Sequence, residues 1–338
     1  MRIPLLVRCA LALSLNTLLS GANTPIMSPA PAGQIQTEAA SETVANLAAG
    51  RVAILVCKDG IVVATAESRV EPDTLPPMIV PLSAFRVGVV LGPIEWIFPG
   101  SGRGPLRLDV ELRRAGSLAA PQKASKESNP ASDIETIGLA FLGPLRDAAA
   151  RIHSRLRLER KEMFTELLLA GYAPDYGPEV WSLRYRVEQQ LLRGEFYQTV
   201  VHRPEYVQLY PPEKGQPRTL VESHYPPEDA SDPPLAELLA GHDARITALR
   251  NADAGLDRAA GFLEKGESQK VFFVDGLEFV RAVMQGVIPR DRRQMIATIR
   301  QDKGVEWVAG AELAGPAIPR EKGAPGAPSL YKQPKPPR

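Results

Sequence analysis

The chain has 338 residues, 44% of them apolar, which is enough for one large domain or two small ones. Its 40 basic and 39 acidic residues give a formal net charge of +1. Because such a balance produces no long-range electrostatic field, the composition argues against nucleic acid or anionic lipid as a partner.

The first 22 residues have the pattern of a secretory signal peptide. Arg2 and Arg8 flank a short apolar run, the longer run Cys9–Leu19 follows, and small residues before Asn23 favour cleavage near Ala22. Cleavage there predicts a protein that is periplasmic or secreted. It also removes two basic residues, so the net charge of the mature chain becomes −1. Later apolar segments are shorter than the roughly 20 residues that cross a bilayer, so the mature chain is expected to have no membrane span.

The cysteines exclude a disulfide scaffold. Removal of the leader removes Cys9, and Cys57 alone cannot form an intramolecular disulfide. Cys57 lies inside an apolar run, where a thiol is normally buried and inert. A reactive thiol needs an electropositive and partly exposed setting, so we predict no catalytic role for Cys57.

Residues 23–49 are rich in Ala, Pro, Ser and Thr and predict a disordered linker or pro-segment. The folded body begins at Gly50, followed by two runs of β-branched and aliphatic residues, Val52–Cys57 and Ile61–Thr65. Asp59-Gly60 between these runs is a strong signal for a β-hairpin. Both runs are apolar almost throughout, so we expect the hairpin to be covered on both faces.

The next part of the chain mixes strands and helices. Met78–Leu82 and Phe85–Leu91 predict two strands joined by a tight turn. Leu106–Arg113 is compatible with a half-buried strand or a short helix. Residues 116–133 are rich in Ala, Ser, Lys, Pro and Asn and predict a surface insertion or flexible loop.

Ile134–Lys161 is the longest predicted helical region, because apolar residues recur there at steps of three and four. Pro144 predicts either a kink or the start of a new helix. The apolar positions expected to face the core are Ile137, Phe141, Leu145, Ala149, Ile152 and Leu156.

The second half of the chain alternates strands and helices again. Residues 211–232 are rich in Pro and Asp and predict irregular structure, and residues 311–338 predict a disordered Pro-rich tail. The predicted strands are 166–172, 180–187, 196–201 and 206–209, the predicted helices are 234–249, 253–263 and 274–285, and a closing hairpin joins 295–300 to 305–308.

Three stretches, in this order, resemble proteasome-type N-terminal-nucleophile (Ntn) hydrolases. The run CKDGIVVATAESR at 57–69 is similar to the opening hairpin of that family, residues 164–185 to its central strands, and residues 295–308 to its closing hairpin. The resemblance spans residues 50–310. It implies an α+β fold, a four-layer αββα sandwich of two antiparallel sheets between helices, which agrees with the predicted order of elements.

In that family a threonine at the mature N-terminus is the nucleophile, and its own amine is the base. The resemblance places this threonine eight residues before Lys58, at Gly50, or at Ala49 or Arg51 after a slip of one residue. None of these residues has a hydroxyl or a thiol, and no Ser, Thr or Cys occurs from Val44 to Val56. The sequence therefore predicts no catalytic nucleophile.

The acidic residue and the lysine of the family's active site have no exact counterparts in this chain either. The position of its acidic residue corresponds to Ala66, with Glu67 beside it as the candidate residual acid. Its lysine belongs to the following strand region, yet no lysine occurs between residues 69 and 105. Arg86 and Arg103 are the basic residues there, and arginine is a poor substitute because it stays protonated.

Other chemistries have weaker signals, and we predict no cofactor and no metal site. The glycine-rich residues 99–105 lack the spacing of a phosphate-binding loop, and Gly-x-Ser-x-Gly is absent. The basic cluster Arg155–Lys161 is better explained as a solvated helix face than as a nucleic-acid site. Metal-ligand spacing is missing among the four histidines, His153, His202, His224 and His242.

These observations predict an exported, proteasome-like pseudoenzyme that acts in binding or assembly, as a homo-oligomer or with an unidentified protein or peptide partner. Two alternatives stay open. Processing that exposes Ser41 or Thr43 would give an Ntn peptidase or amidase, although both residues lie far ahead of the first strand. A secreted, envelope-associated scaffold with Pro-rich binding ends is the other alternative.

Overall fold

The computed structural model describes residues 50–67, 79–91, 97–98, 106–119, 130–152, 162–173, 176–191, 197–212, 221–225, 239, 244–288 and 293–311. The predicted signal peptide, the linker 23–49 and the tail beyond residue 311 lie outside these residues, as does the basic cluster at 155–161. Within the described part of the chain, no helix is both long enough and apolar enough to cross a bilayer.

The predicted opening and closing hairpins both belong to one antiparallel sheet, called here the first sheet, with strand order β11-β1-β2-β12-β13. The opening hairpin pairs Val56 with Ile61, so the turn consists of the four residues between them. The strands are β1 (Gly50–Val56), β2 (Ile61–Glu67), β11 (Val221–Tyr225), β12 (Gln294–Arg300) and β13 (Gly304–Ala309).

The second sheet is also antiparallel, with the order β10-β8-β7-β4-β3, and β9 pairs with the far end of β8. Its strands confirm the four predicted between residues 166 and 209 and the pair at 78–91. They are β3 (Ile79–Ser83), β4 (Arg86–Leu91), β7 (Glu162–Ala173), β8 (Gly177–Leu191), β9 (Tyr197–Val201) and β10 (Glu205–Tyr210). A separate short pair is formed by β5 (Ile97–Phe98) and β6 (Leu106–Arg107).

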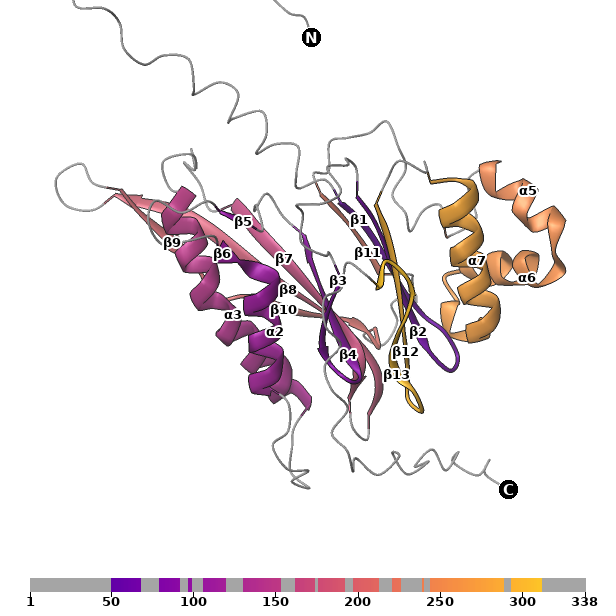
Figure 1. Ribbon diagram of the computed structural model, residues 1–338, viewed down its shortest axis with the longest axis horizontal. Coiled ribbons are helices and arrows are strands. Elements are labelled where there is room, and N and C mark those ends of the chain that lie inside the picture. The colour runs from indigo at the N-terminus through magenta and orange to yellow at the C-terminus, as the bar shows by residue number, and fades with distance from the viewer. Residues whose placement is uncertain are drawn as a thin grey trace, which may run out of the picture.

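Helices lie on the outer side of each sheet, and Figure 1 shows the resulting succession of layers. One outer layer, α2 and α3, covers the second sheet, and the other, α5, α6 and α7, covers the first sheet. The helices are α2 (Leu108–Ala119), α3 (Pro130–Ile152), α5 (Ala244–Ala252), α6 (Ala254–Leu263) and α7 (Phe273–Gly286), with a short 3₁₀ helix, η1 (Ser268–Lys270), before α7.

Three apolar cores fill the spaces between these layers. Neighbouring residues of a strand point to opposite faces, so Ile54 packs between the two sheets while Leu55 packs under the helices of the first sheet. The opening hairpin is therefore covered on both faces, as its continuous apolar sequence predicts. This mixed α+β arrangement of two antiparallel sheets and outer helices is compatible with the predicted sandwich.

Two predictions about irregular segments are wrong. Residues 116–119 belong to α2 and residues 130–133 to α3, so the predicted insertion 116–133 is helical at both ends. Gly116 allows α2 to lie close to β3, because a Cβ there would meet Leu82 Cβ at 2.7 Å. Residues 211–232 were expected to be irregular, yet β11 forms within them and pairs with β1.

The long central helix is confirmed, and Pro144 does not end it. α3 runs as one helix from Pro130 to Ile152 with Pro144 inside it. Its predicted core positions that the structure describes, Ile137, Phe141, Leu145 and Ala149, are all buried against the second sheet.

Candidate functional site

The position that the resemblance assigns to a nucleophile is the first residue of β1. In the backbone register Gly50 lies opposite Glu67 of β2 on one side and Tyr225 of β11 on the other. The two positions singled out from the sequence, Gly50 and Glu67, are therefore neighbours across one strand pair. Because glycine has no side chain, this end of the hairpin offers no nucleophile at that position.

Arg86 is the described basic residue in the strand region where the family has its lysine. It lies at the opposite end of the sheets from Gly50. The backbone N–H of Val305, which follows the β12–β13 turn, donates to the carbonyl of Ala84 in the β3–β4 turn at 2.7 Å. That turn end lies about 20 Å from Gly50, since β1 rises about 3.3 Å per residue. Arg86 is buried there and forms an ion pair with Glu179, which also accepts a hydrogen bond from Trp181 Nε1 at 2.9 Å.

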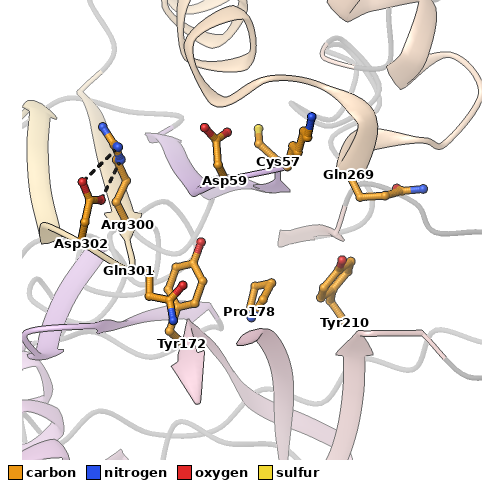
Figure 2. A pocket seen from close by; sticks show the side chains of 10 residues that line it. Cys57, Asp59, Tyr172, Pro178, Tyr210, Gln269, Arg300, Gln301 and Asp302 are labelled. Carbon is orange, nitrogen blue, oxygen red and sulfur yellow. Dashed lines mark hydrogen bonds and ion pairs between the residues drawn. The ribbon is translucent and has the colours of Figure 1, made fainter. Parts of the chain in front are cut away.

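The turn end also contains a pocket of about 520 Å³ between the two sheets (Figure 2). Its lining comes from the β1–β2 turn, the adjoining ends of β7 and β8, the end of β10, η1, and the end of β12 with the turn that follows it. Segments that are far apart in the sequence, from residue 57 to residue 302, thus meet around this pocket. Figure 2 shows the rings of Tyr172 and Tyr210 pointing from the second sheet toward the hairpin that carries Cys57 and Asp59.

Backbone and side-chain hydrogen bonds hold the hairpin wall of the pocket in place. The N–H of Cys57 donates to the carbonyl of Gly60 at 2.8 Å, and the N–H of Lys58 donates to the carbonyl of Val271 at 2.9 Å. Asp59 Oδ1 accepts from the N–H of Phe273 at 3.0 Å, which satisfies one of the unpaired donors at the start of α7. The hairpin wall is therefore preorganised by its contacts with η1 and α7.

The opposite side of the pocket carries an ion pair in the β12–β13 turn. Arg300 contacts Asp302 through two nitrogen–oxygen pairs, Nε with Oδ1 and Nη2 with Oδ2, each at 3.2 Å. The guanidinium also lies 5.4 Å from the centre of the Phe273 ring. Lys58 at the hairpin lies over the neighbouring ring, with its Nζ 4.5 Å from the centre of Phe272.

Cys57 lines this pocket but is chemically inert. Burial, together with the negative charge of Asp59, raises the pKa of its thiol to about 12. The thiolate is the nucleophilic form, so the thiol stays unreactive near neutral pH. The prediction of a buried thiol in the hairpin is confirmed.

The predicted absence of metal-ligand spacing concerned four histidines, two of which the structure describes. His202 Nε2 lies 3.2 Å from Glu188 Oε1, and His224 lies in β11 opposite Arg51. His153 and His242 lie outside the described residues. Among the residues that are described, no three His, Cys, Asp or Glu side chains gather as a metal site.

No protein-family model matches this chain, and a search of curated proteins finds no matching sequence. The pocket itself was missed by the sequence-based prediction. Its residues come from separate turns and strand ends and form no motif. Several of them, Cys57, Lys58 and Asp59 among them, lie in stretches singled out from the sequence, but only as parts of hairpins. The signal that could have found it is that the strand pairs β1–β2, β7–β8 and β12–β13 are hairpins whose connected ends lie at a shared end of the fold.

Proposed function

We propose that this chain is an exported protein with the proteasome-type Ntn-hydrolase fold that lacks the family's nucleophile and acts in binding or assembly. The observation that carries the proposal is the place of Gly50. It is the first residue of β1, where the resemblance puts the catalytic threonine. A residue without a side chain cannot attack a carbonyl, so no acyl-enzyme can form there.

Two further features support the choice of fold. The chain order places a hairpin of the first sheet first, the second sheet and its helices next, and the closing hairpin of the first sheet last. The opening hairpin also keeps Asp59-Gly60 in its turn and brings Glu67 opposite Gly50. A degenerate active site on such a scaffold would have an acid, Glu67, one residue beyond the family's position at Ala66, and no nucleophile.

Assembly is favoured by the outer surface of the helices over the second sheet. Val110 and Leu118 of α2 and Leu139 of α3 are large apolar side chains with exposed fractions of 51%, 63% and 39%. The outer layer over the first sheet exposes Phe272 and Val274 at the start of α7 in the same way. Apolar side chains on the outer helices are suited to burial against another subunit or a partner protein.

A covalent active-site probe tests this function directly. The protein recovered from the exported fraction is incubated with a peptide vinyl sulfone, with an active Ntn hydrolase as the control, and its intact mass is measured. The proposal predicts no adduct on the folded protein, because both Gly50 and the buried Cys57 are unreactive. An adduct at the N-terminal residue of the recovered chain would establish an active hydrolase.

A further inference from the structure

The pocket at the turn end is separate from the position of the missing nucleophile. Gly50 begins β1, whereas the pocket lies beyond the end of that strand, next to Cys57 and Asp59. Whatever occupies the pocket is therefore bound about 20 Å from Gly50, given the rise of a strand. An inference about its ligand does not depend on the hydrolase resemblance.

The charges of the pocket are balanced and largely neutralised in place. Arg300 is paired with Asp302, and Asp59 accepts the N–H at the start of α7. Lys58 lies at the rim over the ring of Phe272. Two positive and two negative side chains give no net attraction for an anion or a cation, so a neutral ligand suits this site.

The same side chains still present many hydrogen-bonding groups. A guanidinium has five N–H donors, and the hydrogen bond to Asp302 uses Nη2 of Arg300, while each carboxylate keeps further acceptor capacity. Hydrogen bonds to such charged groups are stronger than those between neutral groups. The amides of Gln269 and Gln301 add donors and acceptors, and Gln269 Oε1 has no hydrogen-bond partner among the described residues.

Apolar surfaces complete the lining on the side of the second sheet. The rings of Tyr172 and Tyr210 point into the pocket with Pro178 between them (Figure 2). Flat rings of this kind pack against the C–H face of a ligand ring. The volume of about 520 Å³ lies in the usual range for sites that hold a small organic ligand.

We propose that this pocket binds a neutral sugar, of the size of a short oligosaccharide. A sugar has C–H faces for the tyrosine and proline rings, and hydroxyls that both donate to carboxylates and amides and accept from Arg300. A zwitterionic amino acid is disfavoured because the charges of the turn already neutralise one another. A peptide bound through its main chain would need an open strand edge, whereas this pocket is lined by side chains from turns, from η1 and from strand ends.

Calorimetric titration of the mature protein with maltose, cellobiose and N,N′-diacetylchitobiose tests the proposal. At least one of these sugars is expected to bind with one-to-one stoichiometry. Asp302→Asn, at a position whose side chain is 61% exposed and thus tolerant of change, is expected to weaken binding at least about fivefold. Tyr210→Leu, which keeps an apolar side chain but removes the ring, is expected to weaken it by about tenfold.

The control variant is Glu306→Gln, which removes an exposed carboxylate of β13 outside the pocket and should leave affinity unchanged. Circular dichroism and the thermal midpoint show that each variant is folded. The proposal is wrong if no sugar binds, if binding is equal in all variants, or if the dipeptide Ala-Ala binds in a pocket-dependent way and the sugars do not. None of these outcomes changes the vinyl sulfone test of the proposed function.

Discussion

Cys57 illustrates how a single residue depends on the layers around it. Its side chain lies under α7, which approaches so closely at Gly276 that a Cβ there would be 2.7 Å from the sulfur. This packing excludes water from the thiol and raises its pKa to about 12, against an ordinary value of 9.0. The thiol is therefore part of the core of the first sheet and its helices.

The raised pKa of Cys57 predicts a dependence of stability on pH. The unfolded thiol loses its proton near pH 9 and the folded thiol near pH 12. The contribution of Cys57 to the unfolding free energy is therefore constant below about pH 9 and falls as the pH rises toward 12. The difference in unfolding free energy between the wild type and Cys57→Ala should therefore shrink above about pH 9. Urea denaturation of both proteins in reductant measures this difference, and a constant gap from about pH 8 to 10.5 would refute the explanation.

Gly60 predicts a steric requirement at the turn of the opening hairpin. A Cβ at this position would lie 2.3 Å from Cδ2 of Phe273, the first residue of α7. Gly60→Ala should therefore lower the unfolding free energy by about 1–3 kcal/mol, as overpacking of a core does. The matched control is Gly261→Ala in α6, which meets nothing within 4 Å and should raise stability by about 0.5–1 kcal/mol. Equal effects of the two substitutions in chemical denaturation would contradict this reading.

At the scale of elements, the buried ion pair between Arg86 and Glu179 joins the start of β4 to the start of β8. Glu179→Ala leaves the guanidinium buried without its carboxylate, so we expect a loss of about 3–5 kcal/mol in unfolding free energy. The double variant Arg86→Met/Glu179→Leu should recover most of that loss, because no unpaired charge remains. A double variant less stable than Glu179→Ala would show that the pair itself is required.

The proposed assembly predicts that the exposed apolar side chains of α2 form the contact between subunits. Val110→Glu combined with Leu118→Glu should weaken self-association at least about tenfold, which corresponds to about 1.4 kcal/mol. Thr247→Glu combined with Asn251→Glu adds the same charge to exposed positions of α5 and should have no effect. Light scattering over a concentration series gives the association state, and a wild type that is monomeric throughout would exclude self-assembly through this layer.

Elements defined by local patterns could be predicted from the sequence, and elements defined by distant contacts could not. Asp59-Gly60 and the flanking apolar runs are sufficient to predict the opening hairpin. By contrast, β11 is only five residues long and exists through its pairing with β1, more than 150 residues away. Gly116 lowers the local preference for helix, yet it is the residue that lets α2 approach Leu82.

For the whole molecule, the two ends of the pair of sheets are chemically different. The Gly50 end begins the fold where the resemblance expects a nucleophile, and the turn end holds the pocket, the buried Arg86 and the inert Cys57. The missing nucleophile can be predicted from the sequence, because counting back from Lys58 shows that no residue with a hydroxyl stands at the expected position. The sequence does not predict the pocket, because Tyr172, Tyr210 and Asp302 come together only through the pairing of strands.

The N-terminus of the mature protein decides whether a proteasome-like fold here has a nucleophile beside its first strand. Intact mass and N-terminal sequencing of protein from the exported fraction should give a single start near Asn23, with no cut next to the first strand. Such a chain has no hydroxyl or thiol at its N-terminus beside Gly50. A start at Ser, Thr or Cys close to residue 50, or a self-cleaved pair of fragments, would contradict the proposed absence of a nucleophile and identify an active hydrolase.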